Sequence, residues 1–368
     1  MDDSGNGRPE EGRSPVLEDV AKLAQVSAMT VSRVLHSPEK VRPQTRERVM
    51  AAVRRLGYRP KIAARVPAAG GSGILGVITV DNLRYGPAAT LYAIEQAARR
   101  HDYMISVLRL DASDDRALDE TMELLRGLPV DGIIVGAPLE SAVDRLRAPL
   151  PTDLPLVVAD AAEDIPFPVA AVDQHAGAAR AVRHLLSLGH ETVWHLAGPP
   201  VWVDARSRQD AWREVLTSEG RPVPEPIIGD WSARSGYELG RLIARDPEVT
   251  AVFAANDAMA LGLQRALQAA GRPVPDEVSV VGFDDVPESG YLIPPLTTVH
   301  QDFREVGRRA VQLLLEQLAV PEAEPKAAEP EAKADVAEPE DEDAAPLRSL
   351  IDPKLVVRES TRPPGRPR

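Results

Sequence analysis

The stretch LEDVAKLAQVSAMTVSRVLH, residues 17–36, contains two short amphipathic segments separated by a break at Gln25–Val26–Ser27. Apolar residues recur at helical spacing in LEDVAKLA and again in AMTVSRVLH, so each segment predicts a short helix. Ser27 stands at the start of the second helix, where a side-chain oxygen accepts from the free amides of the first turn. Two helices joined by a tight turn, with hydroxyls and an arginine on the second, predict a DNA-binding helix-turn-helix. A plain helical hairpin with solvated hydroxyls is the alternative.

The second helix has an inward and an outward face. We expect Val31, Val34 and Leu35 to pack inward against Val20 and Leu23. The amides at the start of the helix and the hydroxyls nearest to them are suited to hold a phosphate. The outward face carries Ala28, Met29, Ser32 and Arg33. An arginine at that place reaches a guanine edge in the major groove.

Charge is distributed unevenly along the chain. The formal net charge is −13, yet residues 13–68 hold 12 Lys and Arg against 4 acids. Residues 319–346 hold 10 acids against 2 lysines. Screening over about 8–10 Å hides distant acids from a bound polyanion. The local excess of positive charge therefore favours the DNA-binding interpretation of residues 17–36 over the plain hairpin.

Composition limits the classes of protein that fit. The 368 residues are 43% hydrophobic and 27% charged, which suits a globular protein of two or three domains. No apolar run approaches 18 residues, and the N-terminal MDDSGNGRPEEGR lacks the apolar core of a signal peptide. The chain has no cysteine, which excludes disulfides, zinc–thiolate sites and thiol catalysis. We expect a cytoplasmic protein with no membrane partner.

A third amphipathic helix is expected in RPQTRERVMAAVRRLGY, and the linker AAGGSG follows at 68–73. After the linker, apolar strands alternate with amphipathic helices. Strands are expected at 74–80, 103–110, 130–136, 154–160, 192–198, 250–257 and 278–285. Helices are expected at 88–100, 115–126, 175–188, 206–219, 234–245 and 257–270. This alternation predicts a doubly wound α/β core with parallel sheets, in two lobes.

The Ala/Glu/Pro stretch at 319–346 has the composition of a disordered segment. One further apolar strand, KLVVRES at 354–360, follows it. The acidic stretch is therefore expected to interrupt the core near its end rather than to follow it.

Polar residues stand where several expected strands end. Asp160, Asn256 and Asp284 follow strands directly, and Arg206 is expected in the loop after TVWHLAG. Ligands of parallel α/β sheets bind beyond the carboxyl ends of the strands, and these side chains suit vicinal hydroxyls. Trp231 offers an indole face to a sugar ring. Taken singly, each has a structural alternative, such as helix capping by Asn256, but their convergence predicts a site for a polar small molecule.

Catalytic and metal-binding patterns are lacking in the sequence. Asp284 and Asp285 are adjacent and are not an opposed acid–base pair. Histidines 175, 184, 190 and 195 fall in one region without metal-ligand spacing or a nucleophilic serine. We therefore expect neither an enzyme nor a protein with a metal or cofactor.

The motifs now identify a family. LEDVAKLAQVSAMTVSRVLH and VRPQTRERVMAAVRRLGYRPK resemble the N-terminal domain of the LacI/GalR family of bacterial transcription regulators. From Gly76 to Thr361 the chain resembles the sugar-binding core of that family, which has a periplasmic-binding-protein-like fold. The motifs that carry this resemblance are AGPPVWVDARSR, GDWSARSGYE, AANDAMALG and SVVGFDDVPESGYLIPPLTTVHQDF.

The resemblance implies a domain order and a set of contact residues. The expected segments are a leader at 1–14, a helix-turn-helix domain at 15–60, a hinge and linker at 61–73, a core at 74–318 and 347–361, a disordered insert at 319–346 and a basic tail at 362–368. The expected DNA contacts are Ser27, Ala28, Met29, Thr30, Ser32, Arg33, His36, Arg42, Thr45, Tyr58, Lys61, Val66 and Pro67. The expected effector contacts are Asp160, Arg206, Trp231, Asn256, Asp284 and Phe303.

Several positions depart from the family pattern, among them Met29 at a base-reading position and Gly136 at a ligand position. Gln25 stands where the family usually has a glycine, so a left-handed backbone there costs roughly 1 kcal/mol. Val16 replaces the usual capping threonine. Pro67 stands where the family inserts a leucine of its hinge helix into the minor groove, and its ring would clash with the carbonyl of Ala63. A hinge helix is therefore expected to end near Val66, with Val66 or Pro67 as the wedge.

By resemblance, the protein is a homodimeric repressor on a pseudo-palindromic operator. A small carbohydrate, a galactoside or another disaccharide, is expected to bind between the lobes and to release the operator. Three crossings between the lobes are expected near 161–172, near 298–303 and at the acidic insert, and a dimer surface around Tyr85–Ile94. The alternatives are a sugar-binding receptor and a regulator whose ligand is a corepressor.

Overall fold

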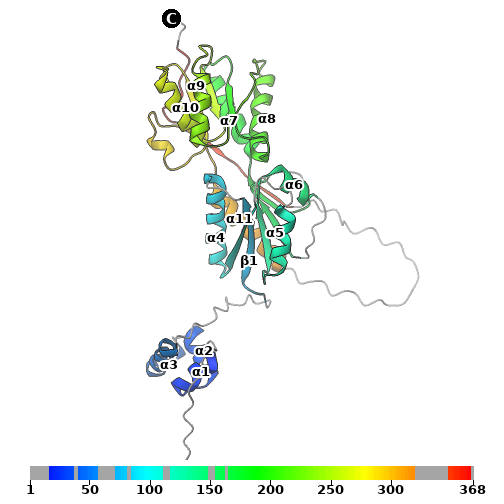
Figure 1. The fold of residues 1–368 in the computed structure, drawn as a ribbon, viewed down its shortest axis with the longest axis vertical. Coiled ribbons are helices and arrows are strands. Elements are labelled where there is room, and N and C mark those ends of the chain that lie inside the picture. Colours follow the sequence, from blue (N-terminus) through cyan, green and yellow to red (C-terminus); the bar gives the residue numbers. More distant parts are fainter. Residues whose placement is uncertain are drawn as a thin grey trace, which may run out of the picture. The chain divides into compact units, whose positions relative to one another are not determined.

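The structure is a computed structural model that describes residues 16–36, 40–56, 71–80, 84–110, 117–147, 154–161, 165–319 and 347–365. The chain divides into two compact units, at residues 1–67 and 68–368 (Figure 1). Each unit is described by itself. Among the described residues, no helix is long and apolar enough to cross a membrane.

The first unit, called the head here, contains the helices α1 (Leu17–Ala24), α2 (Ala28–His36) and α3 (Pro43–Leu56). Val20, Val31 and Val49 are fully buried where the three helices meet. Gln25 ends α1 in the left-handed conformation with φ of 53°, as the turn between the first two helices requires.

One inward residue of the head was assigned incorrectly. Leu23 is 39% exposed, whereas Val20, Ala21 and Ala24 of the same helix are buried. At 100° per residue, position 23 lies roughly 110° from the centre of that buried face. Leu23 therefore flanks the contact with α2 and does not form it.

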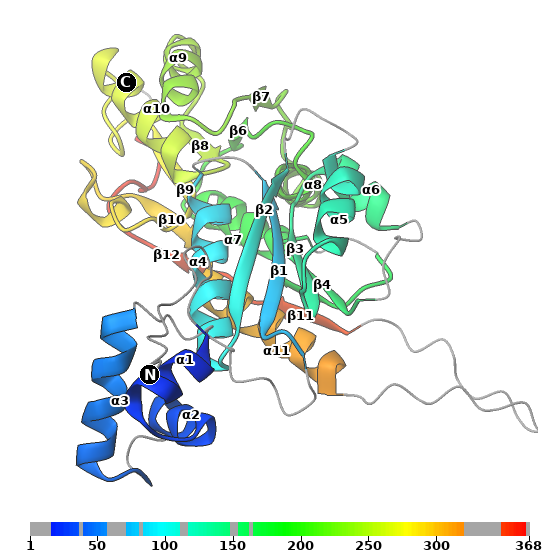
Figure 2. The same ribbon diagram turned by 60° about the horizontal axis from the view of Figure 1, so that its bottom comes forward.

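The first lobe of the second unit is a fully parallel sheet in the order β11-β5-β4-β3-β1-β2. Its strands are β1 (Ile74–Val80), β2 (Met104–Leu110), β3 (Gly132–Gly136), β4 (Leu156–Ala159), β5 (Val169–Val172) and β11 (Arg348–Ile351). The helices α4 (Tyr85–Arg100) and α11 (Phe303–Ala319) cover one face, and α5 (Ala117–Arg126) and α6 (Glu140–Leu146) cover the other (Figure 2). Both faces of β1 are buried for that reason.

The second lobe repeats this plan, with the sheet order β12-β10-β9-β8-β6-β7. Its strands are β6 (Trp194–Ala197), β7 (Ile227–Ile228), β8 (Ala251–Ala254), β9 (Ser279–Asp284), β10 (Thr297–His300) and β12 (Lys354–Val356), of which β12 alone is antiparallel. The helices α7 (Gln174–Ser187) and α8 (Val203–Ser218) cover one face, and α9 (Ala233–Ile243) and α10 (Asp257–Ala269) the other. The expected two-lobed α/β core is confirmed.

The chain passes between the lobes at three places, and two of them differ from our expectation. The first crossing is at Asp173, because residues 169–172 form β5 within the first sheet. The second, at 301–302, lies within the expected range. The acidic insert is not a crossing, since α11 before it and β11 after it both belong to the first lobe. The third crossing is at 352–353, between β11 and β12.

Candidate functional site

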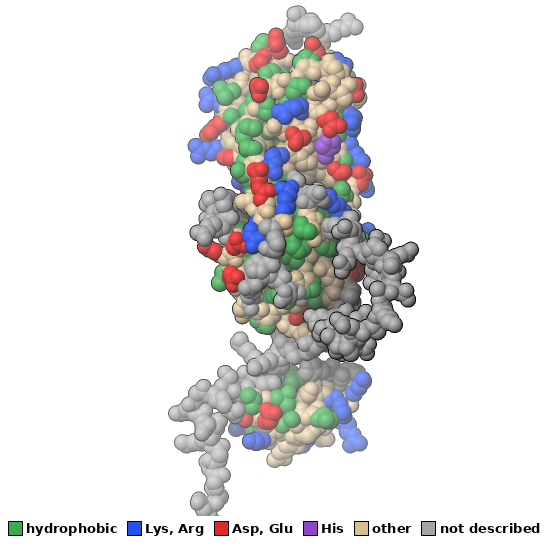
Figure 3. Space-filling view, turned by 90° about the vertical axis from the view of Figure 1, so that its right-hand side faces the viewer, with side chains coloured by type: hydrophobic (Ala, Val, Ile, Leu, Met, Phe, Trp, Pro, Cys, Tyr) green, Lys and Arg blue, Asp and Glu red, His purple; other side chains and the backbone are tan. Residues whose placement is uncertain are grey.

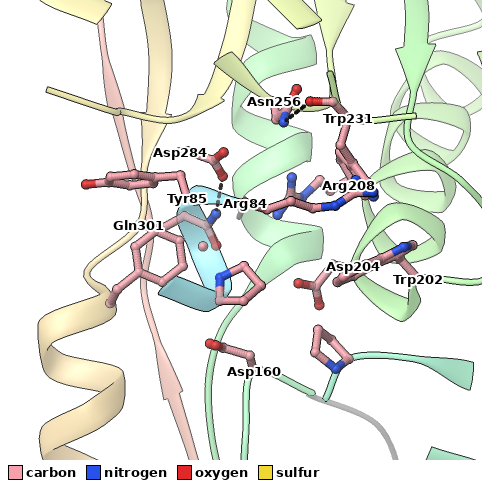
Figure 4. A pocket seen from close by; sticks show the side chains of 14 residues that line it. Arg84, Tyr85, Asp160, Trp202, Asp204, Arg208, Trp231, Asn256, Asp284 and Gln301 are labelled. Carbon is pink, nitrogen blue, oxygen red and sulfur yellow. Dashed lines mark hydrogen bonds between the residues drawn. The ribbon is translucent and has the colours of Figure 1, made fainter. Parts of the chain in front are cut away.

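The candidate site is a cavity of about 510 Å³ between the lobes, where the carboxyl ends of strands from both sheets meet (Figure 4). Small-molecule sites lie preferentially at interfaces of this kind, between two domains or lobes. Its lining residues are Arg84, Tyr85, Gly86, Pro87, Pro138, Asp160, Trp202, Asp204, Arg208, Trp231, Asn256, Asp284, Gln301 and Phe303. Both lobes contribute to the wall, so a ligand in the cavity contacts both.

Five of the six expected effector contacts line this cavity: Asp160, Trp231, Asn256, Asp284 and Phe303. Arg206 does not line it. It lies in helix α8 rather than in a loop, and its guanidinium pairs with Glu140 of the first lobe at 2.7 Å. Arg208, two residues further along, faces the cavity in its place.

Arg208 is only 4% exposed, and its guanidinium is held in place by several contacts. Its Nε donates to Oε1 of Gln174 at 2.9 Å, and Nη1 donates to the carbonyl of Ala255. The guanidinium lies over the ring of Phe283, 3.9 Å from its centroid. Burial lowers the pKa of Arg208, and the charges of nearby aspartates, Asp284 first, oppose that shift. The cavity thus has a fixed cation in its wall.

Two buried carboxylates face this cation from opposite lobes. Burial raises the pKa of Asp160 to about 6 and that of Asp284 to about 7, and the charge of Arg208 offsets part of each shift. Asp284 Oδ1 accepts a hydrogen bond from Gln301 Nε2 at 2.7 Å. Both are suited to accept hydrogen bonds from the hydroxyls of a bound molecule.

Backbone strain is concentrated in the cavity wall. Asp160, Trp231 and Asp284 have φ of 61°, 73° and 117°, in a region that side chains other than glycine rarely adopt. Each such conformation costs of order 1–3 kcal/mol, and strain of this kind collects at binding sites. The wall therefore sacrifices stability to place these three side chains.

Trp231 is fixed from several sides. A Cβ on Gly198 would lie 2.2 Å from Cη2 of the indole, so only glycine leaves room for it. Asn256 donates from Nδ2 to the carbonyl of Trp231 at 3.1 Å while its Oδ1 caps α10 at Met259. The indole Nε1 is buried and has no hydrogen-bond partner among the described residues, so it is a donor available to a ligand. Asn256 has the capping role that we had considered as an alternative, and it also holds Trp231.

On the side away from the crossings, the lobes contact each other directly. The amide of Glu140 donates to Val201 at 3.0 Å, and the amide of Val203 donates to Pro138 at 3.1 Å. Arg84 donates to the carbonyl of Asp230 at 2.9 Å and covers the ring of Trp202 at 5.1 Å. We call these contacts, together with the Arg206–Glu140 pair, the mouth of the cleft. Arg84 follows β1 and Glu140 follows β3, whereas two of the three crossings leave the other edge of the sheet, at β5 and β11.

The start of α2 in the head has the expected cap. Ser27 Oγ accepts from the amide of Thr30 at 3.1 Å, and the two hydroxyls lie 2.9 Å apart. Met29 is 71% exposed on the outward face, and the side chain of Arg33 is also exposed. Lys and Arg side chains gather along one margin of the head, whereas basic and acidic side chains are interspersed on the face of the second lobe that is visible (Figure 3). The start of α2 is thus capped and lies at the surface of the head.

The remaining expected DNA contacts are placed only in part. Arg42 is exposed and Thr45 half-buried, at the start of α3. The His36 side chain and the residues Tyr58, Lys61, Val66 and Pro67 lie outside the described residues. Where the usual capping threonine is absent, Asp19 accepts from the amide of Val16 at 2.9 Å and satisfies one free donor of α1.

The histidines that fall in one region have structural contacts. His195 is fully buried, stacks on Phe253 with centroids 4.8 Å apart, and has a pKa lowered to about 4 by burial. His190 contacts the hydroxyls of Thr250 and Ser279. In the part of the chain that the structure describes, no group of three or more His, Asp or Glu side chains is arranged to hold a metal ion.

Comparison with protein families divides the chain as the structure does. Residues 16–61 match the bacterial regulatory proteins of the lacI family, and residues 182–361 match the periplasmic binding protein-like domain. The lactose operon repressor of Klebsiella pneumoniae is 35% identical over 353 residues, 95% of this chain and 93% of that protein. The transcriptional regulator CelR of Thermobifida fusca is 32% identical over 367 residues, 95% of this chain and 99% of that protein.

Solved structures agree with these relatives. The lac repressor dimer bound to operator and the anti-inducer ONPF matches with a TM-score of 0.76 and 32% identity, over 95% of this chain and all of that one. A complex of the transcriptional regulator CelR with cellobiose matches with a TM-score of 0.63 and 28% identity, over 94% of this chain and 99% of that one. Head and core therefore match together, in one order, across nearly the whole chain.

Proposed function

The chain belongs to the LacI family of bacterial regulatory proteins, and on that premise we propose that it is a transcriptional repressor of carbohydrate-utilisation genes that a small sugar releases from DNA. One observation carries the proposal. The same chain joins a helix-turn-helix with an exposed, capped recognition helix to a core whose cavity is built from both lobes. The first binds DNA, and the second responds to a ligand by changing the angle between its lobes.

The head supplies the DNA contacts of this proposal. The amides at the start of α2, with Ser27 and Thr30, hold a phosphate, and Arg33 reads a base edge in the major groove. The other proposed contacts are Ala28, Met29, Ser32, His36, Arg42, Thr45, Tyr58, Lys61, Val66 and Pro67. We assign residues 15–60 to this domain, 61–73 to the hinge and linker, and the two-lobed core to 74–318 and 347–361.

The protein acts as a homodimer, because two heads are needed to read the two halves of a pseudo-palindromic operator. Helix α4 presents Tyr92, 66% exposed, and the neighbouring edge strand β2 presents Met104, 52% exposed. Apolar side chains at that exposure on adjacent elements support a dimer surface that begins at Tyr85. The lac repressor dimer bound to operator has the same fold.

The effector is a small carbohydrate, a galactoside or another disaccharide. Asp160 and Asp284 accept from sugar hydroxyls, Arg208 donates to them, and Trp231 offers both an indole and a free N–H. Asn256 and Phe303 complete the proposed contacts, and Arg208 takes the place that we had given to Arg206. CelR, solved with cellobiose, shares this fold.

Sugar binding and operator release are coupled through lobe closure. Asp160 and Phe303 belong to the first lobe and Trp231 and Asp284 to the second, so a sugar that touches all four favours the closed arrangement. An operator bound to the open arrangement is then released by linkage. The relatives named above are transcriptional regulators, and we propose that this cavity binds its sugar without turning it over. The protein works in the bacterial cytoplasm, where the operator lies.

The experiment uses the full-length protein. An operator is first selected from random duplexes, and fluorescence anisotropy then follows its release during titration with lactose and cellobiose. We expect at least one of these sugars to release the operator, and Arg33→Ala to lose the preference for the selected sequence while sugar binding is kept. A sugar that tightens operator binding instead would establish the corepressor alternative. A protein that selects no duplex would overturn the repressor assignment.

A further inference from the structure

A chain of buried hydrogen bonds connects two sugar-facing side chains through the crossings. Arg208 Nε donates to Gln174 Oε1 at 2.9 Å, Gln174 Nε2 donates to Gln301 Oε1 at 2.8 Å, and Gln301 Nε2 donates to Asp284 Oδ1 at 2.7 Å. Gln174 and Gln301 are 5% and 4% exposed. We call these four residues the amide relay. It begins at the fixed cation of the cavity and ends at the carboxylate that faces it (Figure 4 shows Arg208, Gln301 and Asp284).

The relay has a direction that its two ends impose. A guanidinium only donates hydrogen bonds, so the carbonyl oxygen of Gln174 must face Arg208. The amide nitrogen of Gln174 then faces Gln301, whose own nitrogen is left to face Asp284. An ionised carboxylate only accepts, so the last bond closes the series without a conflict. Both amide groups are thereby fixed in one orientation, because a reversal of either would set two acceptors or two donors against each other.

The relay also ties the crossings together. Gln174 follows Asp173, the first crossing, and Gln301 lies within the second. The amide of Asp173 in turn donates to the carbonyl of Ile351, which precedes the third crossing, at 3.0 Å. Rotation of one lobe against the other changes the positions of these segments relative to one another, so it acts directly on the bond between Gln174 and Gln301.

We propose that Gln174 is a positioning residue for the sugar site. It orients Arg208 and Asp284, and it couples the binding of sugar at these two residues to the arrangement of the crossings. Gln174 does not line the cavity, so it acts through the residues that do. The inference rests on the proposed function for the identity of the ligand class. A sugar that engages Arg208 and Asp284 polarises both ends of the relay and strengthens the bond between Gln174 and Gln301. The arrangement of the crossings that keeps the relay intact is therefore the one that a bound sugar favours.

The test compares three full-length variants. Gln174→Leu removes the bond to Arg208 and the bond to Gln301. Gln174→Glu keeps the shape and the acceptor for Arg208 but has no N–H for Gln301, which must then turn its carbonyl oxygen toward Asp284. Gln264→Leu is the matched control, because Gln264 is also 5% exposed in the second lobe and its Nε2 has no partner among the described residues. Sugar affinity is measured by calorimetry with lactose and with cellobiose, and amide hydrogen exchange is followed at 173–177 and 299–303 without sugar.

We expect both Gln174 variants to weaken sugar binding by about tenfold or more and to speed exchange at both crossings, while Gln264→Leu does neither. The comparison with Gln174→Glu separates positioning from packing, since a role in packing alone would leave this near-isosteric variant like the wild type. The proposal is overturned if Gln174→Glu matches the wild type in both measurements. If the wild type itself binds neither sugar, the proposed effector class fails, and exchange at the crossings still decides whether the relay holds them.

Discussion

The two sides of the cleft hold the lobes together by different means. On the crossing side, three chain segments are linked by the buried Gln174–Gln301 bond and by the backbone bond from Asp173 to Ile351. On the mouth side, the Arg206–Glu140 pair has its side chains 34% and 54% exposed. A buried polar group that loses its partner costs about 1–3 kcal/mol, whereas an exposed ion pair contributes about 0–1 kcal/mol. The Arg206–Glu140 pair is therefore a contact between the lobes that opens at low cost, whereas the relay bonds on the crossing side are costlier to break.

The largest expected effect comes from removing the buried cation. Arg208→Leu leaves Asp284 and Asp160 without their positive neighbour and ends the amide relay. We expect a loss of about 3–5 kcal/mol in the free energy of unfolding at pH 8, measured by urea denaturation. At pH 5.5 the loss is smaller, because the two carboxyls then take up protons.

Arg206→Leu is the control for that variant, since it removes the same charge two residues away at the mouth. A loss for Arg208→Leu that is no larger than the loss for Arg206→Leu would abolish the distinction between the two sides.

The next effect is a dependence of the free energy of unfolding on pH, which arises at Asp284 on the crossing side. Burial raises the pKa of Asp284 from its ordinary 3.8 to about 7, so the folded protein binds a proton there that the unfolded chain has released. Stability from this group is therefore present below about pH 4 and is lost as the pH rises to about 7. Asp284→Asn cannot titrate. The wild type should thus lose on the order of 2–4 kcal/mol relative to Asp284→Asn over this range.

The wild type must be compared with Asp284→Asn at each pH, because buried histidines change stability with pH in the opposite direction. Burial lowers the pKa of His195 to about 4, so His195 adds stability as the pH rises from about 4 toward 6.5. Both proteins share this histidine, and its effect cancels in the comparison. A difference between the urea midpoints that does not change with pH would show that Asp284 remains ionised at pH 5.

The sequence was sufficient to predict most of the architecture. The expected strands correspond to β1, β2, β3, β4, β6, β8, β9 and β12, with ends trimmed by a few residues. The strands β5, β7, β10 and β11 were not expected. VAAV and TTVH lack the large apolar residues that mark a strand, and β7 has only two residues. The unexpected β11 is also the reason why the third crossing was misplaced.

At the site, the same reasoning selected Arg206, whereas it is Arg208 that lines the cavity. Arg206 and Arg208 are two residues apart in α8, so their side chains point roughly 200° apart and only one can face the cavity. The helix phase was present in the sequence, because Arg208 shares its face with Ala205, Trp212 and Val215, all of which are buried. The role of Gln174 had no such signal, since it depends on which segments cross between the lobes.

The smallest expected effect is at the mouth. There, a faster dissociation of sugar without a loss of folding stability would assign the Arg206–Glu140 pair to lobe closure. Glu140→Gln removes the ion pair with Arg206 and should change the free energy of unfolding by less than about 1 kcal/mol. It should nevertheless raise the dissociation rate of cellobiose or lactose a few-fold, because the pair joins the two lobes across the mouth. Stopped-flow tryptophan fluorescence measures this rate, and the increase should shrink between 50 mM and 500 mM salt as screening weakens the pair in the wild type. Arg234→Gln, which breaks an exposed pair with Glu238 within α9, is the control and should leave the rate unchanged. If the increase in dissociation rate does not change with salt, the Arg206–Glu140 pair is shielded from solvent like the buried contacts of the crossings, and the distinction between the two sides fails.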